Sequence, residues 1–263
     1  MRRRKKETKT PIADAVHPTA ARGFNDGVVY EQGRPSYPPE AVTALNISPP
    51  HTVVDLGCGT GKFTRLLTPT GARIIGIEPL AIMNEMFRTT CPNVTLLTGV
   101  AERLPLRACA VDLITCASAF HWFDHERALP ELHRVLRTAG RLAIIWNRRD
   151  KLAGWPAEFF AITEQYRGDT PGYRSNAWRD AIDGSALFGP IEERWFDNVQ
   201  HADLDGLLAR VESISFIETL PASEKAAVIA RAREFLVTHP DTRGREHFEL
   251  PYHTALYVTR RLN

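Results

Sequence analysis

The sequence predicts an α/β fold built on a doubly wound, mostly parallel sheet, and three observations lead to that prediction. From residue 51 onward, apolar segments of strand length alternate with segments of helical periodicity. The first apolar segment, "VVDL", runs directly into a glycine-rich turn, "GCGTG". The 263 residues are enough for one sizeable domain of this class. Because strands that alternate with helices pair in parallel between two helical layers, both faces of the sheet should be covered.

The first half of the chain shows the alternation in order. The second helix should stop before Pro92, and the third should end at Gly140, a residue favoured just after a helix. Since Pro130 fits poorly inside a helix, the regular part of the third helix should begin near it. Strands are expected in 51–57, 72–79, 93–105, 108–123 and 141–147, and helices in 62–71, 80–91 and 126–140.

The second half is less regular. Segment 151–185 is rich in aromatic residues and is expected to be helical, outside any simple strand–helix–strand unit. The last helix should be capped by Ser223 and should stop before Pro240. Strands are expected in 191–202 and 247–261, and helices in 204–220 and 223–239.

Composition narrows the class of protein. Apolar residues make up 43% and charged residues 24%, which is ordinary for a globular chain. A net charge of +2 gives no strong attraction to nucleic acid or an anionic membrane. No apolar stretch approaches the ~18–20 residues that span a bilayer, and no secretory signal follows the basic start. The four cysteines show no C-x-x-C pairing and are interpreted as reduced thiols, so a cytoplasmic location is expected.

The chain begins with a basic segment. Arg2 to Lys6 carry five positive charges, and residues 1–22 are expected to be a disordered tail, with nucleic-acid or lipid contact as the alternative. Residues 23–263 are expected to form one domain.

The glycine-rich turn fits one of three patterns. A phosphate-binding P-loop requires G-x-x-x-x-G-K-[ST], but Gly57 and Gly61 are one residue too close and Phe63 replaces the hydroxyl. A dinucleotide turn requires G-x-G-x-x-G, and Lys62 stands where the third glycine would allow close helix packing. The remaining pattern is an acidic residue, Asp55, followed by G-x-G-x-G, in which bare backbone can approach a ligand closely.

Two carboxylates accompany this turn. Glu78 ends the second predicted strand, where a carboxylate can accept hydrogen bonds from both hydroxyl groups of a ribose. Asp55 either borders the ligand or caps the loop that follows it.

Five segments in this order resemble the class I S-adenosylmethionine-dependent methyltransferases: "VVDLGCGTG", "IIGIEP", "GVAERLP", "VDLITCASAFHWFD" and "LHRVLRTAGRLAII". Further, "RPSYPPE", "AFHWFD" and "LPYHTALYVTRR" resemble the branch that contains trans-aconitate methyltransferase. The resemblance covers about residues 24–150 and, more loosely, the last strand. It implies S-adenosylmethionine as cofactor, a small-molecule acceptor, and the Rossmann-like methyltransferase fold of seven strands with the last one antiparallel.

The resemblance also implies roles for single residues. An N-terminal lid, 24–50, would carry Tyr30 and Arg34, and Arg34 would pair with the cofactor's carboxylate or with an acidic substrate. The remaining cofactor residues would be Asp55, Gly57, Cys58 and Gly59 at the methionine part, Glu78 at the ribose, Pro79, Ala101 and Glu102 at the adenine, and Ser118 and Ala119 near the sulfonium.

The acceptor should lie beside the fourth strand. His121, Trp122 and Trp146 are expected to line its pocket, with 151–185 as a helical cap forming the other wall. His121 could orient or deprotonate the acceptor, or only support the loop. His121 and His125 have a spacing that can bind metal on a helix, but no further ligands accompany them and no metal is expected.

A sulfonium methyl group is already activated, so the protein mainly has to position an acceptor for in-line displacement. A carboxylate acceptor needs no base, whereas a hydroxyl acceptor does. The expected function is methyl transfer to a small carboxylate or hydroxyl compound. The alternatives are a cofactor-binding protein that acts through a partner, and a nucleic-acid or protein methyltransferase. The sequence "ASAFHW" stands where amino-directed nucleic-acid enzymes carry [DN]-P-P-[YF].

Overall fold

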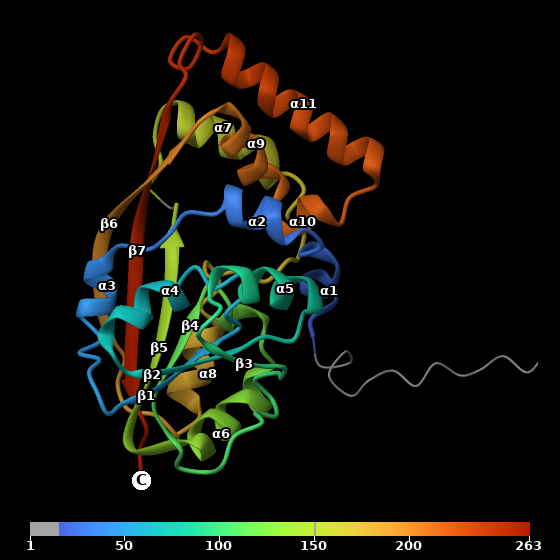
Figure 1. The fold of residues 1–263 in the computed structure, drawn as a ribbon. Coiled ribbons are helices and arrows are strands. Elements are labelled where there is room, and N and C mark those ends of the chain that lie inside the picture. Colours follow the sequence, from blue (N-terminus) through green and yellow to red (C-terminus); the bar gives the residue numbers. More distant parts are fainter. Residues whose placement is uncertain (1–15, 150) are drawn as a thin grey trace, which may run out of the picture.

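The computed structural model describes residues 16–149 and 151–263, and its centre is a large sheet (Figure 1). In these residues seven strands have the order β3-β2-β1-β4-β5-β7-β6. Strands β1 to β5 pair in parallel, and β7 runs antiparallel to both of its neighbours. The predicted seven-stranded, mostly parallel sheet with an antiparallel last strand is confirmed. The strands are β1 Thr52–Leu56, β2 Arg73–Ile77, β3 Thr95–Leu97, β4 Val111–Ala117, β5 Leu136–Arg148, β6 Glu192–Ala202 and β7 Phe248–Arg260.

Helices cover both faces of the sheet because its strands are apolar on both sides. Val53 of β1 packs in one core and Val54 in another, as the two-residue period of a strand requires. Helices α3 and α4 cover the first face, and α6 and α8 cover the second. Helix α5 packs Phe87 against Gly76 of β2. These helices are α3 Pro39–Thr43, α4 Thr64–Leu67, α5 Ala81–Thr90, α6 His125–Val135 and α8 Ala177–Gly184, with short 3-10 turns at Thr68–Thr70 and Phe120–Trp122.

A separate core lies beyond the carboxyl end of β5, at the top of Figure 1. Phe159 and Phe160 pack there with Phe248 and Leu250 at the start of β7. We call the four helices of this region the cap: α7 Trp155–Glu164, α9 Leu204–Glu212, α10 Ser215–Glu218 and α11 Ala222–Thr238.

The predicted cap segment, 151–185, is divided between the two regions. Its first part forms α7 in the cap, whereas Trp178 and Ile182 of α8 pack in the sheet core with α6. After α7 the chain returns to the sheet, where it forms α8. Strand β6 then extends from the sheet back to the cap (Figure 1). Most of the cap comes from residues after 203, which the sequence did not assign to it.

Two N-terminal helices, α1 Pro18–Gly23 and α2 Gly27–Gly33, lie between the sheet and the cap (Figure 1). A Cβ on Gly33 would collide with the backbone of Ala209, so glycine permits the close packing of α2 on α9. Helix α1 falls within the predicted disordered tail, 1–22, and corrects that prediction for residues 18–22. The basic residues of the predicted tail lie outside the described residues.

The structure corrects three predicted helix boundaries, which are the start and the end of α6 and the start of α11. Helix α6 begins at His125 and contains Pro130 in its interior, since its buried face of Ala128, Leu129 and Leu132 outweighs one missing hydrogen bond. It ends at Val135, because Leu136 already pairs with Val111 of β4. Gly140 therefore lies inside β5 and caps nothing, and Ala139 takes the left-handed conformation instead, with φ of 60°.

Helix α11 also begins earlier than predicted. Pro221 precedes its first residue, so Ser223 lies inside the helix and makes no capping hydrogen bond. Its end at Thr238, before Pro240, agrees with the prediction. Within the described residues, no helix combines the length and the apolar character needed to cross a bilayer.

Candidate active site

The glycine-rich turn lies at the carboxyl end of β1, beside the end of β2. Gly57 and Gly59 have φ of 67° and 54°, values that glycine adopts without steric cost. A Cβ on Gly57 would lie 2.6 Å from the Cβ of Ala119, whereas a Cβ on Gly59 would project into open space. The turn therefore presents bare backbone to an open region, as a closely bound ligand requires.

Glu78 follows β2 and faces this turn. Its Oε2 accepts a hydrogen bond from the N–H of Gly59, and its Oε1 accepts one from the N–H of Leu80, both at 3.0 Å. The residue is 5% exposed, and burial raises the pKa of Glu78 to about 7, against the lowering effect of the two N–H groups. Each oxygen keeps a free lone pair, so the carboxylate is oriented to accept hydrogen bonds from ligand hydroxyl groups.

A first cavity opens beside Glu78. Its other walls are mostly apolar, with Leu80, Met83 and Phe123 among them. An apolar cavity with one oriented carboxylate fits a flat heteroaromatic ring joined to a diol. The predicted site residues that line it are Tyr30, Gly57, Gly59, Glu78, Pro79, Ala101, Glu102, Ser118, Ala119 and Trp122.

Asp55 is not among the residues that line this cavity. It is fully buried, and its two oxygens accept hydrogen bonds from the hydroxyls of Thr64 at 2.6 Å and Thr115 at 3.0 Å. Burial raises the pKa of Asp55 to about 6, and the hydrogen bonds from the two hydroxyl groups only partly oppose this increase. Thr64 opens α4, so Asp55 holds the helix that follows the glycine turn. Asp55 thus contacts two threonine hydroxyl groups and makes no capping hydrogen bond to the backbone of α4.

A second cavity lies on the other side of the glycine turn. Arg34, Cys58 and Lys62 line it, although the Cys58 side chain packs with Phe87 in a small apolar cluster. Across the cavity, the hydroxyl groups of Ser118 and Tyr37 are hydrogen-bonded at 2.8 Å.

A third cavity extends from the end of β4 toward the cap. His121, Trp122 and Trp146 line it, together with Arg34. Tyr30 and Ser118 border all three cavities, so the cavities meet at these two residues. The structure therefore gathers every predicted site residue except Asp55 around one junction at the carboxyl ends of β1 and β4.

Comparison with known proteins identifies the family. An uncharacterised methyltransferase of Mycobacterium tuberculosis (strain H37Rv) is 36% identical over 226 residues, which cover 86% of this chain and 90% of the relative. The methyltransferase domain family matches residues 54–144. The chain belongs to the class I S-adenosylmethionine-dependent methyltransferases. Its cofactor is S-adenosylmethionine.

Two further similarities bear on the fold and the branch. The YcgJ protein from Bacillus subtilis superposes with a TM-score of 0.57 over 84% of this chain and 96% of that one, at 20% identity, and so has the same fold. The trans-aconitate 2-methyltransferase of Paracidovorax citrulli is 28% identical over 243 residues, 81% of this chain and 86% of the relative.

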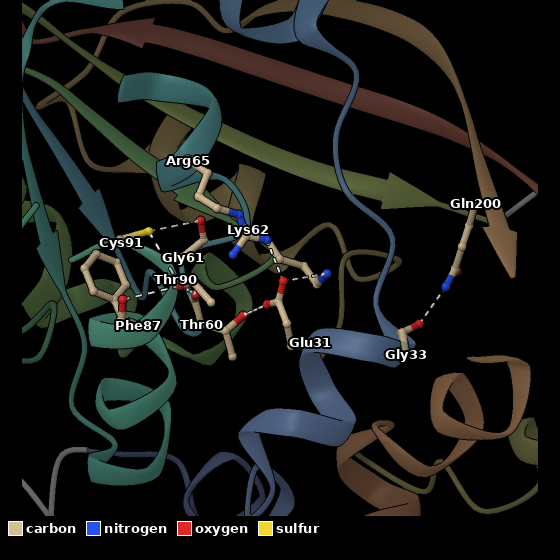
Figure 2. Close-up of polar contacts among 10 residues, drawn as sticks. All are labelled: Glu31, Gly33, Thr60, Gly61, Lys62, Arg65, Phe87, Thr90, Cys91 and Gln200. Atoms are coloured by element: carbon tan, nitrogen blue, oxygen red, sulfur yellow. Dashed lines mark hydrogen bonds and ion pairs between the residues drawn. The ribbon is translucent and has the colours of Figure 1, made fainter. Parts of the chain in front are cut away.

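In this methyltransferase, Glu31 ties helix α2 to the glycine turn, as Figure 2 shows. Its Oε2 accepts a hydrogen bond from the hydroxyl of Thr60 at 2.6 Å. Its Oε1 lies 3.3 Å from Nζ of Lys62 and 2.5 Å from the guanidinium of Arg65. We call these three contacts the Glu31 latch. Sequence reasoning used Lys62 only to reject a dinucleotide site and missed Glu31, since nothing local joins the two residues.

His121 is a neutral side chain with a defined tautomer. Its Nδ1 accepts a hydrogen bond from the indole N–H of Trp146 at 3.2 Å, and an indole can only donate. Burial, with Arg34 and Arg167 nearby, lowers the pKa of His121 to about 3. The ring proton must then be on Nε2, which makes His121 a hydrogen-bond donor and a very weak base. His125 makes a different contact, since its Nε2 is hydrogen-bonded to the carbonyl oxygen of Phe120 at 3.0 Å.

Arginines of the third cavity are the site residues that sequence reasoning missed. Arg149, Arg167 and Arg210 line it beside Arg34. They come from the end of β5, the segment after α7, and α9. Arg210 had a local signal in the sequence, because it interrupts the apolar run "LLARV". The structure shows it to be only 3% exposed. The others had none, because their approach depends on how the cap packs.

Proposed function

We propose that this methyltransferase transfers the methyl group of S-adenosylmethionine to a carboxylate oxygen of a small molecule. The observation that carries the proposal is the junction at Tyr30 and Ser118, where a cavity suited to adenosine meets a cavity enclosed by the cap. A methyl donor on one side of this junction and an acceptor on the other could reach a near-attack position.

The cofactor would occupy the first and second cavities. Glu78 would accept hydrogen bonds from the ribose hydroxyls, and Pro79, Ala101 and Glu102 would surround the adenine. Gly57, Cys58 and Gly59 would face the methionine part, and Arg34 with Lys62 would attract its carboxylate. Ser118 and Ala119 would lie near the sulfonium, with Tyr30 of the α2 lid above it. Asp55 would support this arrangement from behind, without touching the ligand.

A carboxylate acceptor is favoured over a hydroxyl because the third cavity offers no suitable base. None of its described lining residues is an aspartate or glutamate, and His121 is a very weak base. In the transfer, a carboxylate oxygen forms a bond to the methyl carbon while the carbon–sulfur bond breaks and sulfur keeps the electron pair. No proton moves in this step. The Nε2–H of His121 would instead orient the acceptor.

A small acceptor fits this cavity better than a nucleic acid or a protein does, because Tyr30 of α2, Trp146 of β5 and residues of the cap such as Arg210 line it from several sides. The trans-aconitate relative is named for a small-molecule acceptor, which is consistent with the proposal. We also propose a cytoplasmic location, supported by the four cysteines, which are all free thiols.

The test is an assay for S-adenosylhomocysteine formed by the purified protein with separate panels of small carboxylates, alcohols and phenols. We expect turnover only with carboxylates and a product that mild alkali hydrolyses to methanol, as a methyl ester requires. An alkali-stable methyl ether would contradict the carboxylate assignment. Binding of S-adenosylmethionine without turnover on any panel, or on cell extracts that contain small metabolites, would favour a cofactor-binding protein that acts through a partner.

A further inference from the structure

Three arginines that line the third cavity each have a buried guanidinium nitrogen whose hydrogen-bonding capacity is unused. Nε of Arg34, Nη1 of Arg149 and Nη1 of Arg210 have no hydrogen-bond partner among the described residues. The Arg149 side chain is 9% exposed and Arg210 is 3% exposed. Buried charged nitrogens are costly when they remain unpaired. Three of them in the lining of one cavity indicate that the missing partner is a ligand.

Among the described residues, carboxylates neutralise this cluster only in part. Glu164 is shared: it binds Arg167 through both oxygens, at 2.8 and 2.9 Å, and lies 3.8 Å from Nη2 of Arg149. Arg34 and Arg210 have no ion pair with any described residue. The described lining of the cavity therefore carries more positive than negative side chains.

The surrounding structure holds these guanidinium groups in place. Arg149 and Arg210 both lie over the ring of Phe160, with Cζ at 3.9 and 5.3 Å from its centroid. Nε of Arg210 donates to the hydroxyl of Tyr252 at 3.2 Å, and Arg34 donates to the carbonyl oxygen of Ser213. Charged groups that are fixed before binding lose little freedom when a ligand arrives.

The charges also repel one another. Burial is the main cause that lowers the pKa of Arg34 to about 9 and that of Arg149 to about 10, and the charge of Arg210 adds to both effects. Arg34 and Arg149 therefore remain cationic near neutral pH. An anion placed among them would relieve both the burial cost and the repulsion.

We infer that the acceptor carries a second anionic group, besides the carboxylate that is methylated, and that Arg149 and Arg210 bind this second group on the cap side of the third cavity. Arg34, which the proposed function places at the carboxylate of the cofactor, adds positive charge beside them. The inference rests on the proposed function. The chemistry that a guanidinium cluster recognises is a carboxylate or a phosphate, because both present oxygens in a plane that matches the guanidinium fork. The acceptor class is thus a small dicarboxylate or a phosphorylated carboxylate.

Arg149 separates this second site from the cofactor site. Arg34 and Arg210 line both the second and the third cavity, so either could also approach the carboxylate of the cofactor. Arg149 lines only the third cavity. Its substitution should therefore affect the acceptor and not the cofactor.

The test measures anion binding by titration calorimetry on the full chain saturated with S-adenosylhomocysteine, with acetate, glutarate and inorganic phosphate as probes. We expect glutarate or phosphate to bind at least tenfold more tightly than acetate, and the tighter of the two identifies the second anionic group. Arg149→Gln should weaken this binding at least tenfold and change the affinity for S-adenosylhomocysteine less than twofold. Equal affinities for all three anions, or tight binding unchanged in Arg149→Gln, would overturn the inference.

The matched control is Arg233→Gln, the same substitution at an arginine of the cap that is 52% exposed and lies outside the cavity. It should leave anion binding unchanged. If Arg149→Gln does not fold, Arg149→Lys keeps the charge without the planar fork and should reduce binding by a smaller factor. Tight anion binding without methyl-ester formation would reject the proposed function alone, whereas ester formation with an Arg149→Gln KM equal to that of the wild type would reject this inference alone.

Discussion

Burial and the proposed ribose contact act in opposite directions on the ionisation of Glu78. Its folded pKa of about 7 is well above its ordinary value of 4.5, because burial disfavours the carboxylate. The protonated side chain therefore stabilises the free protein fully below pH 4.5, and this contribution is lost as the pH rises toward 7. A ribose diol would instead favour the ionised form, since the carboxylate must accept two hydrogen bonds from it.

Cofactor affinity should consequently depend on pH. Between pH 8 and pH 6 we expect the Kd of S-adenosylhomocysteine to rise about tenfold, since a proton must leave Glu78 before the ligand binds. Titration calorimetry at the two pH values measures this change. Glu78→Gln should bind more weakly and lose the pH dependence. Identical Kd values for the wild type at pH 6 and pH 8 would show that Glu78 does not ionise on binding.

At the scale of elements, α2 lies between the glycine-rich turn and the cap, where it packs against α9. The Glu31 latch holds one side of α2 to the glycine turn, and Nε2 of Gln200 in β6 donates to the carbonyl oxygen of Gly33 at 2.8 Å (Figure 2). Tyr30 of the same helix borders all three cavities. Because α2 thus forms part of the wall of the proposed cofactor site, we expect the latch to affect cofactor exchange more than folding.

Removing the latch should speed cofactor release. Partly exposed ion pairs contribute about 1 kcal/mol or less. We therefore expect Glu31→Gln to raise the dissociation rate of S-adenosylhomocysteine by up to about fivefold, with little change in the free energy of unfolding. Stopped-flow displacement measures the rate. Glu40→Gln, on the exposed side of α3, should leave it unchanged. Equal rates in the Glu31 variant and the wild type would exclude a gating role for α2.

Elements were predictable where local pattern and tertiary packing agree. The strands that end at Leu56, Ile77 and Ala117 are short apolar runs bounded by turns, and they appear as expected. The end of α6 was not predictable, because it depends on the pairing of Leu136 with Val111, a contact across the sheet. The extent of the cap could not be predicted for a similar reason, because α7 and α8 follow one another in sequence but pack in different cores.

At the scale of the whole molecule, β7 joins the two regions. Phe248, Leu250 and Tyr252 at its start pack in the cap core, whereas Ala255 and Tyr257 pack in the sheet core. One continuous strand thus contributes to both cores, and it pairs along its length with β6. The loss of either core would disturb the strand that supports the other.

The protein should therefore unfold in one cooperative transition. S-adenosylhomocysteine at 100 times its Kd should add about 2.7 kcal/mol to the free energy of unfolding and, at about 2–4 °C per kcal/mol, raise Tm by roughly 5–11 °C. Leu250→Ala, in the cap half of β7, should cost about 2–5 kcal/mol and lower the same single transition. Scanning calorimetry measures the number of transitions. Two separate peaks, of which only one shifts with the ligand, would contradict the coupling of the two cores.

The sequence by itself determined the class of fold and the methyl donor. Both rest on segments that can be read along the chain: the strand and glycine turn, Glu78 about 20 residues on, and the further segments whose order resembles the methyltransferase family. The acceptor side was decided only by the tertiary structure. Arg34, Arg149 and Arg210 are far apart in the chain, and their charges meet because α2, β5 and α9 pack around one cavity. The proposed donor site is therefore largely local in sequence, whereas the proposed acceptor site arises from long-range packing.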